Sequence, residues 1–397
     1  EMCIRDRFFL HRYPLPLTII VAIGVWFRFI ALAVKHVFHI FTNLLGRWLR
    51  RIKALLFSST EDNIDPSFLQ FKTSDSSSNG RVLVLGGNSQ IGHFLIPRLI
   101  NAGYTVTATS RKKIKNSTIN QLQWSQLNLE SEDELKLPDD TITVISLAPV
   151  WLLASKINEI ADQGVRRLIF FSSTSRFTKL QSSNDADRNL ASRLAESEGR
   201  LIEECENYGV RWTLFRPTLV YGCGLDKNIF SIATFIRRFG CFIMAGNGNG
   251  CRQPVHADDL ADACLKVLQN KATYQQDYNL SGGETLSYSR MVELVFKLLG
   301  RKQRLCVVNR PLLKSITGMV SLLPGLRHVT PAMVDRMEED LCFDHSPAKK
   351  DFSYAPRGFL ETPYFKQNSL IPLPAEKKRS ALSALKGKKI LVTGAGG

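Results

Sequence analysis

The sequence lacks the cysteine and histidine patterns that mark metal sites and disulfide frameworks. Its eight cysteines include no C-x-x-C pair and no histidine-rich spacing. No recognisable nucleic-acid-binding module accompanies the net charge of +16. We therefore expect buried thiols in a reducing compartment, with no metal centre, no disulfide framework and no nucleic-acid partner.

Acidic residues are scarce at the N-terminus, where positive charge is concentrated. Residues 1–57 hold nine Lys/Arg and two Asp/Glu. The apolar run Leu15–Phe27 is interrupted by Arg28 and resumes over Phe29–Val34, close to the ~20 residues of a bilayer-spanning helix. Phe41–Phe57 places Leu, Trp and Ile between four cations, a pattern typical of a helix on an anionic interface. This predicts a membrane-associated helical segment on the cytoplasmic side of the bacterial inner membrane. A helical hairpin packed on a soluble domain is the alternative.

Polar linkers divide the rest of the chain. Residues 58–80 are serine-rich and without periodicity, which predicts a flexible linker, and residues 361–387 predict a second one. The closing KKILVTGAGG (residues 388–397) has the strand and glycine turn that begin a dinucleotide-binding domain. The first 57 residues resemble in composition the membrane-proximal tail of bacterial family 2 glycosyltransferases. We therefore expect a fragment of a longer protein, in which a fused glycosyltransferase and a second dinucleotide-binding domain flank residues 81–360.

The stretch that organises the main body is a glycine-rich turn between a strand and a helix. Arg81–Leu85 is a short apolar run typical of a buried parallel strand, an amphipathic helix follows over residues 91–101, and Tyr104–Thr109 predicts a second strand. Glycines at such a turn let the backbone approach a pyrophosphate, and the helix N-terminus supplies free N–H groups. A tight turn in another kind of α/β protein is the alternative. The predicted cofactor-binding residues of this turn are Gly86, Gly87, Asn88, Ser89, Gln90, Ile91 and Gly92.

No carboxylate follows the second strand. NAD sites usually place an acidic residue there for the ribose hydroxyls, whereas a cation accommodates the 2′-phosphate of NADP. The chain has Ser110, Arg111, Lys112 and Lys113 instead. We therefore predict NADP as the cofactor and NAD as the second choice, with a solvated basic loop as the alternative.

Strands and helices alternate beyond this unit. Four further strands are predicted, at 122–127, 141–147, 166–171 and 211–215. The alternation predicts an α/β fold with a doubly wound parallel sheet of the Rossmann type, which binds ligands at the carboxyl ends of its strands. The residues expected near the cofactor at two of these ends are Asn128, Leu129, Leu147, Ala148 and Pro149.

Five segments together resemble a known family. They are VLGGNSQIG (84–92), LIFFSSTS (168–175), RPTLVYG (216–222), GCRQPVHADDLADACL (250–265) and YNLSGGETLSY (278–288). In this order and spacing they resemble extended or atypical short-chain dehydrogenase/reductases of the NAD-dependent epimerase/dehydratase type, which act on nucleotide sugars. The resemblance implies a small C-terminal substrate lobe and a nucleotide-sugar or lipid-linked sugar substrate. It also implies that Pro217 lies beside the cofactor and that a homodimer is a possible assembly.

The family's acid/base pair has no counterpart in this sequence. Relatives transfer protons with a Ser or Thr after the fifth strand and with a Tyr four residues before a Lys on the next helix. Thr174 matches the hydroxyl position. If Glu198 matches the family's glutamate, Leu190 and Leu194 occupy the Tyr and Lys positions. Because residues 178–207 contain no tyrosine, no shift of register restores the pair.

Three hypotheses follow from the missing pair. In the first, the protein uses another acid or base, and Tyr221 is the candidate because the corresponding loop of relatives borders the nicotinamide. In the second, Tyr221 only packs, which is the commoner role of such a residue. In the third, the domain binds a nucleotide and catalyses nothing.

The substrate side keeps more of the family's pattern. Arg252 lies where nucleotide-sugar epimerases place an arginine on the substrate diphosphate, a group that suits a guanidinium fork, although a surface ion pair is the alternative. His256 continues the same motif as a predicted substrate contact. The alternative for His256 and Asp259 is that they cap and bridge the helix beginning near Asp258. Ser89 replaces the middle glycine of the phosphate motif, and its hydroxyl either bonds the phosphate or crowds it.

Two functional hypotheses result. The leading one is a membrane-tethered NAD(P)-dependent sugar-nucleotide epimerase, dehydratase or reductase that serves cell-surface polysaccharide synthesis. The rival is a non-catalytic NADP-binding scaffold with the same fold.

Overall fold

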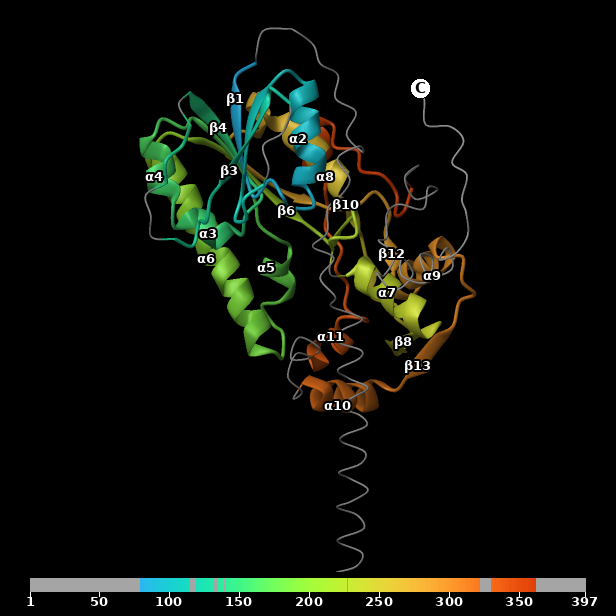
Figure 1. Ribbon diagram of the computed structural model, residues 1–397. Helices are drawn as coiled ribbons and strands as arrows, with labels where there is room; N and C mark the ends of the chain where they lie inside the picture. Colours follow the sequence, from blue (N-terminus) through green and yellow to red (C-terminus); the bar gives the residue numbers. More distant parts are fainter. Residues whose placement is uncertain are drawn as a thin grey trace, which may run out of the picture. The chain divides into compact units, whose positions relative to one another are not determined.

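The computed structural model describes residues 79–114, 119–131, 135–138, 140–226, 228–321 and 330–361 (Figure 1). The predicted membrane segment (1–57), all but the end of the first linker, nearly all of the second, and residues 388–397 lie outside these ranges. Within them, no helix is both long enough and apolar enough to span a bilayer.

A parallel sheet of seven strands forms the centre of the described chain, in the order β11-β6-β5-β4-β1-β2-β3. This order confirms the predicted Rossmann-like α/β fold. The strands are β1 (Arg81–Leu85), β2 (Thr105–Ser110), β3 (Leu122–Gln126), β4 (Thr141–Ser146), β5 (Arg167–Phe171), β6 (Arg211–Pro217) and β11 (Gln276–Leu280).

Helices cover both faces of the sheet (Figure 1). Because side chains alternate along a strand, β1 sends Val82 and Val84 into one core and Leu83 and Leu85 into the other. Burial on both faces explains why the central strands are continuous apolar runs. The first core includes α2 (Gly92–Asn101), α8 (Ala257–Val267) and α12 (Ser346–Phe352), and the second includes α3 (Val150–Ala154), α4 (Ile157–Asp162) and α6 (Asp185–Asn207).

A smaller lobe has its own hydrophobic core, as the family resemblance implies. It is built mainly from α7 (Ile229–Phe239), β8 (Phe242–Ala245), β9 (Cys251–Arg252), β12 (Leu286–Ser287), α9 (Tyr288–Leu298), β13 (Leu305–Val308), α10 (Arg310–Ser321) and α11 (Pro331–Asp335). Short elements connect the parts: α5 (Ser175–Thr178), β7 (Val220–Tyr221), β10 (Val255–His256) and the 3-10 turn η2 (Lys271–Thr273).

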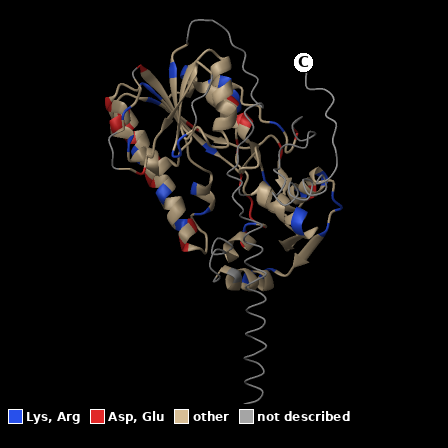
Figure 2. Cartoon of the chain, viewed as in Figure 1, with Lys and Arg blue, Asp and Glu red and all other residues tan. Residues whose placement is uncertain are grey.

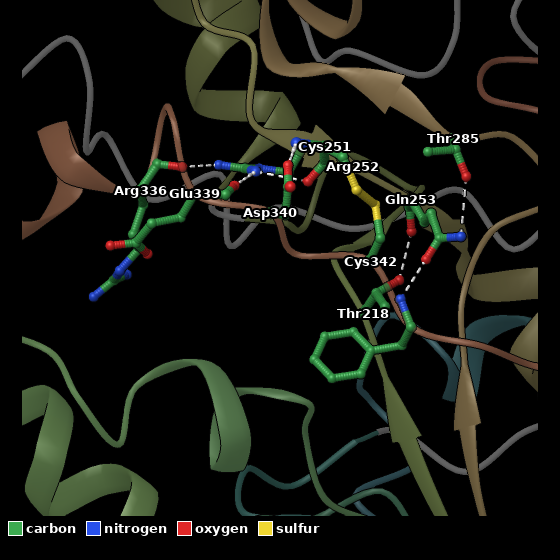
Figure 3. The surroundings of a disulfide bond; sticks show 10 residues. Thr218, Cys251, Arg252, Gln253, Thr285, Arg336, Glu339, Asp340 and Cys342 are labelled. Carbon is green, nitrogen blue, oxygen red and sulfur yellow. Dashed lines mark hydrogen bonds between the residues drawn. A yellow bond between two sulfur atoms is a disulfide. The ribbon is translucent and has the colours of Figure 1, made fainter.

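One disulfide corrects the expectation that all cysteines are thiols. Cys251 and Cys342 are bonded, with their Cα atoms 6.0 Å apart (Figure 3). The bond joins β9 to the segment that follows α11, 91 residues further along the chain. Cys205 is a buried thiol as expected, and burial raises its pKa to about 12. The long separation of the bonded pair explains why spacing gave no signal for it.

Candidate functional site

The glycine turn lies where the strand order of the sheet reverses. β1 is flanked by β4 on one side and β2 on the other, so the chain leaves neighbouring strands in opposite directions. Such a reversal opens a crevice at the carboxyl ends of the strands, which is where ligands bind in this architecture. Gly86 has φ +74°, and a Cβ there would lie 3.3 Å from the backbone of Leu147 and Ala148. The turn after β1 and the turn after β4 therefore meet in this crevice, as predicted.

Close backbone packing fixes the path of the turn. A Cβ on Gly92 would lie 2.1 Å from the carbonyl oxygen of Gly87, and a Cβ on Gly87 would lie 2.9 Å from Cβ of Ala108. Neither position has room for a side chain. The start of α2 is thereby held against the end of β1, and its first N–H groups, from Gly92 to Leu95, already donate to Ser89 and Ile91.

The Ser89 side chain is bonded within the turn. Its Oγ accepts a hydrogen bond from the Gly92 N–H at 3.2 Å, so the side chain turns back toward the helix start. The neighbouring Gln90 Nε2 and the Ser146 Oγ at the end of β4 are buried, with no hydrogen-bond partner among the described residues. Buried donors without acceptors cost free energy. A dinucleotide, which carries many acceptor oxygens, fits a crevice with these two groups.

The end of β2 presents cations to solvent. Ser110 is buried and its Oγ accepts from the Lys112 N–H at 3.3 Å, while the Arg111 and Lys112 side chains are exposed. Gln126 Nε2 donates to the Arg111 carbonyl oxygen and ties this turn to β3. The backbone of this turn is held by hydrogen bonds, and the exposed Arg111 and Lys112 side chains make the turn positively charged.

The two predicted residues in the turn after β3 differ in their exposure to solvent. Asn128 is exposed, and its Oδ1 accepts from the Glu130 N–H at 3.2 Å. Leu129 is 9% exposed and packs into the second core. Leu129 is therefore a core residue here, which corrects its assignment as a cofactor contact.

Thr174 is anchored beside the last residue of β6. Its N–H and its Oγ both donate to the Pro217 carbonyl oxygen, at 3.2 and 3.1 Å. Thr174 is 6% exposed at the start of α5, and its hydroxyl, which donates to Pro217, can still accept a hydrogen bond. The structure therefore brings Thr174 and Pro217 together, as the resemblance implied.

Helix α6, on which the family carries its Tyr and Lys, has leucines at the two positions assigned from the sequence. Leu194 is 4% exposed in the second core, and Leu190 packs against the same core. Glu198, four residues further on, is fully buried and bonds to Ser172 and Arg176 as well as to Arg216. If Glu198 matches the family's glutamate, these two leucines occupy the Tyr and Lys positions.

The Glu198 cluster was not predicted as a unit. Arg216 Nε and Nη2 contact Glu198 Oε2 at 2.9 and 2.8 Å, and Arg216 Nη1 bonds to Asp277. Burial works against the charged form of Arg216, but the hydrogen bonds to the two carboxylates raise its pKa overall. The signal in the sequence was an arginine at the end of an otherwise apolar strand, next to a proline.

Tyr221 is a buried packing residue, as in the second of the three hypotheses. It is 1% exposed, its Oη accepts from the Leu360 N–H at 3.0 Å, and its ring lies edge-on to His256 and Phe359 at 5.1 Å each. Burial raises the pKa of Tyr221 far above neutrality. The structure gives Tyr221 the packing role, because its side chain is buried and its Oη is bonded to the backbone of Leu360.

His256 follows the capping alternative. Its Nδ1 accepts from the Asp258 N–H at 3.1 Å at the start of α8, and the side chain is 2% exposed. Burial lowers its pKa to about 4, so the imidazole is neutral at pH 7. Asp259 bonds to Arg357 and bridges α8 to the end of the described chain. The predicted substrate contact through His256 is corrected to a structural one.

Arg252 also has a structural set of contacts. Its Nη1 donates to the carbonyl oxygens of Cys251 and Glu339 at 2.7 Å, and its Nη2 donates to that of Arg336 (Figure 3). Arg252 as a whole is 3% exposed, and burial lowers the pKa of its guanidinium. These bonds and the adjacent disulfide hold residues 336–342 on β9. The contacts correct the prediction that the arginine fork is directed at a diphosphate.

An unpredicted ion cluster joins the lobe to the start of α6. Asp187 accepts from Lys179 Nζ at 2.8 Å and from Arg336. Burial opposes ionisation of Asp187, but the two cations outweigh it and its pKa is lowered. Asp187 is one helical turn before Leu190, so these charges border the place of the missing tyrosine.

Comparison with known proteins agrees with this architecture. The model of the NAD dependent epimerase/dehydratase family matches residues 151–281. This central third of the chain is therefore similar to the NAD-dependent epimerase/dehydratase family. A festuclavine dehydrogenase from Aspergillus fumigatus is 25% identical over 66% of this chain and 87% of its own length, and a UDP-glucose 4-epimerase from Vibrio cholerae is 20% identical over 55% and 76%.

Solved structures show the same fold. MoeE5 in complex with UDP-glucose and NAD matches 76% of this chain and 100% of its own, with a TM-score of 0.54 and 18% identity. A UDP-N-acetylglucosamine 4-epimerase from Methanobrevibacter ruminantium matches 74% and 97%, with a TM-score of 0.54 and 17% identity. The epimerase/dehydratase domain is therefore similar to proteins solved with NAD and with nucleotide sugars.

Proposed function

We propose that the epimerase/dehydratase domain binds NADP(H) and acts on a nucleotide sugar as an epimerase, dehydratase or reductase. The observation that carries the proposal is the crevice at the switch point of the sheet, where the glycine turn, the Leu147–Pro149 turn and Thr174 come from neighbouring strand ends. The orphaned Gln90 and Ser146 groups support a bound dinucleotide. Thr174 would orient a substrate hydroxyl through its free lone pairs.

The preference for NADP rests on the cations at the end of β2. Exchanging Arg111 and Lys112 for glutamate should lower the affinity for NADPH by about 10- to 100-fold, because each exchange removes an attraction to the 2′-phosphate and adds a repulsion. NADH affinity should change little. Fluorescence titration with each nucleotide measures both values. The control exchanges the basic pair of α12, Lys349 and Lys350, for glutamate, and should leave both affinities unchanged.

A second candidate is favoured by the two leucines of α6. With Leu190 and Leu194 in the acid/base positions and Tyr221 buried, a non-catalytic NADP-binding scaffold of the same fold accounts for the described side chains. Exchange of solvent deuterium or of hydride into any of a panel of nucleotide sugars, by protein with bound NADP, would exclude the scaffold. Binding without any exchange across the panel would exclude the enzyme.

The cellular setting is part of the same proposal. The basic apolar N-terminal sequence supports a position on the cytoplasmic face of a bacterial inner membrane and a role in cell-surface polysaccharide synthesis. A fused glycosyltransferase, a second dinucleotide-binding domain and a homodimer remain predictions from the sequence and the family resemblance.

A further inference from the structure

One helix of the lobe turns an apolar stripe to solvent. On α10, Leu312 is 56%, Ile316 45% and Met319 71% exposed. Their spacing of four and three residues places them on one narrow face, while Leu313, about 100° further round the helix, is buried in a small core with Val334. A surface helix of a soluble domain normally has its polar face outward. The outward face of α10, formed by Leu312, Ile316 and Met319 and here called the α10 face, is apolar instead.

The chain leading into α10 is strongly basic. From Leu294 to Ser321 there are six Lys/Arg and no Asp/Glu (Figure 2). Arg301, Lys302 and Arg304 are exposed just before β13, and the charge of Arg301 contributes to lowering the pKa of Arg237 on α7, after burial. Like charges gathered in this way repel one another and attract an anionic surface. Val307, which is 60% exposed on β13, adds apolar surface between these cations and α10.

Two charges of α10 itself are already partly neutralised. Arg310 and Lys314 contact Asp335 of α11 at 3.0 and 2.6 Å. Since one carboxylate serves two cations, the pair still carries a net positive charge next to the α10 face. An apolar helix face flanked by cations is the pattern of a helix that lies in the interface of a bilayer containing anionic lipids.

We propose that the α10 face docks on an anionic lipid bilayer, with Leu312, Ile316 and Met319 in the interface and the cations of residues 297–314 against lipid headgroups. This contact is separate from the predicted segment 1–57 and does not depend on the proposed enzyme activity. It would hold the lobe, and with it the substrate side of the domain, at the membrane surface.

Local hydrogen exchange of the full chain tests the proposal. Residues 1–57 are themselves expected to bind membranes, so bulk sedimentation with vesicles does not report on α10. We expect amides of residues 310–321 to exchange about tenfold more slowly with vesicles of phosphatidylcholine and phosphatidylglycerol than with phosphatidylcholine alone. The double variant Ile316→Glu and Met319→Glu should lose this protection. Ile142→Glu, an equally exposed position on β4, should keep it.

Retained NADPH binding and unchanged exchange elsewhere show that the double variant is folded. Equal exchange of residues 310–321 with and without anionic vesicles would overturn the proposal. So would protection that appears without lipid and grows with protein concentration, because the α10 face would then be covered by a second copy of the chain.

Discussion

Replacing Glu198 by alanine should lower the free energy of unfolding by about 3–5 kcal/mol, the usual cost of removing one partner from a buried ion pair. The carboxylate is fully buried and serves Arg216, Arg176 and the Ser172 hydroxyl. Without it, Arg216 keeps its charge in a site that is 92% shielded from solvent, and the half-exposed Asp277 is its remaining ion-pair partner among the described residues. Urea unfolding of the purified chain, followed by circular dichroism, measures the change.

A matched control lies on the same helix. Glu196 is exposed, so Glu196→Ala should change the unfolding free energy by less than about 0.5 kcal/mol. Glu198→Gln keeps the shape and two hydrogen-bonding atoms but loses the charge, and should fall between the two. A loss below about 1 kcal/mol for Glu198→Ala would show that the cluster does not hold β5, β6 and α6 together.

The Gly92→Ala exchange should lower dinucleotide affinity by at least about 100-fold, because the added methyl group meets the Gly87 carbonyl oxygen at 2.1 Å. A backbone oxygen cannot rotate away, so the turn must open and the first N–H groups of α2 must move. The same collision should also destabilise the fold, by the few kcal/mol typical of an overpacked site. Titration with NADPH, beside thermal unfolding, separates the two effects.

Gly199→Ala is the control for the same chemical change. Gly199 is inside α6, and no atom lies within 4 Å of the methyl group it would gain. That exchange should leave affinity unchanged and stabilise the helix by up to about 1 kcal/mol. NADPH binding by Gly92→Ala within a few-fold of the unchanged protein would mean that the cofactor does not rest on this turn.

The sheet was predictable because its signals are local. The apolar runs, the glycine turn and the helix after it are set by neighbouring residues, and burial of β1 on both faces requires the pattern that the sequence shows. The positions of Thr174 and Leu194 followed from the family's spacing, which the parallel sheet preserves. The meeting of the turns after β1 and β4 was predictable for the same reason, whereas the turn of the Leu129 side chain into the core was not.

The roles of Arg252 and Tyr221 depended on partners far along the chain. Arg252 is held by carbonyl oxygens more than 80 residues away, and Tyr221 by the N–H of Leu360. A motif shows which side chain is present, but the C-terminal segment that covers it decides whether the side chain reaches a ligand. The Cys251–Cys342 bond belongs to the same set of long-range contacts.

The central claim is that the switch-point crevice binds a dinucleotide and prefers NADP. Titration of the full chain with NADPH and, separately, with NADH tests it most directly. The account predicts dissociation constants in the micromolar range for NADPH and clearly weaker binding of NADH. Absence of binding for both nucleotides would contradict the account, and tighter binding of NADH would contradict the role given to Arg111 and Lys112.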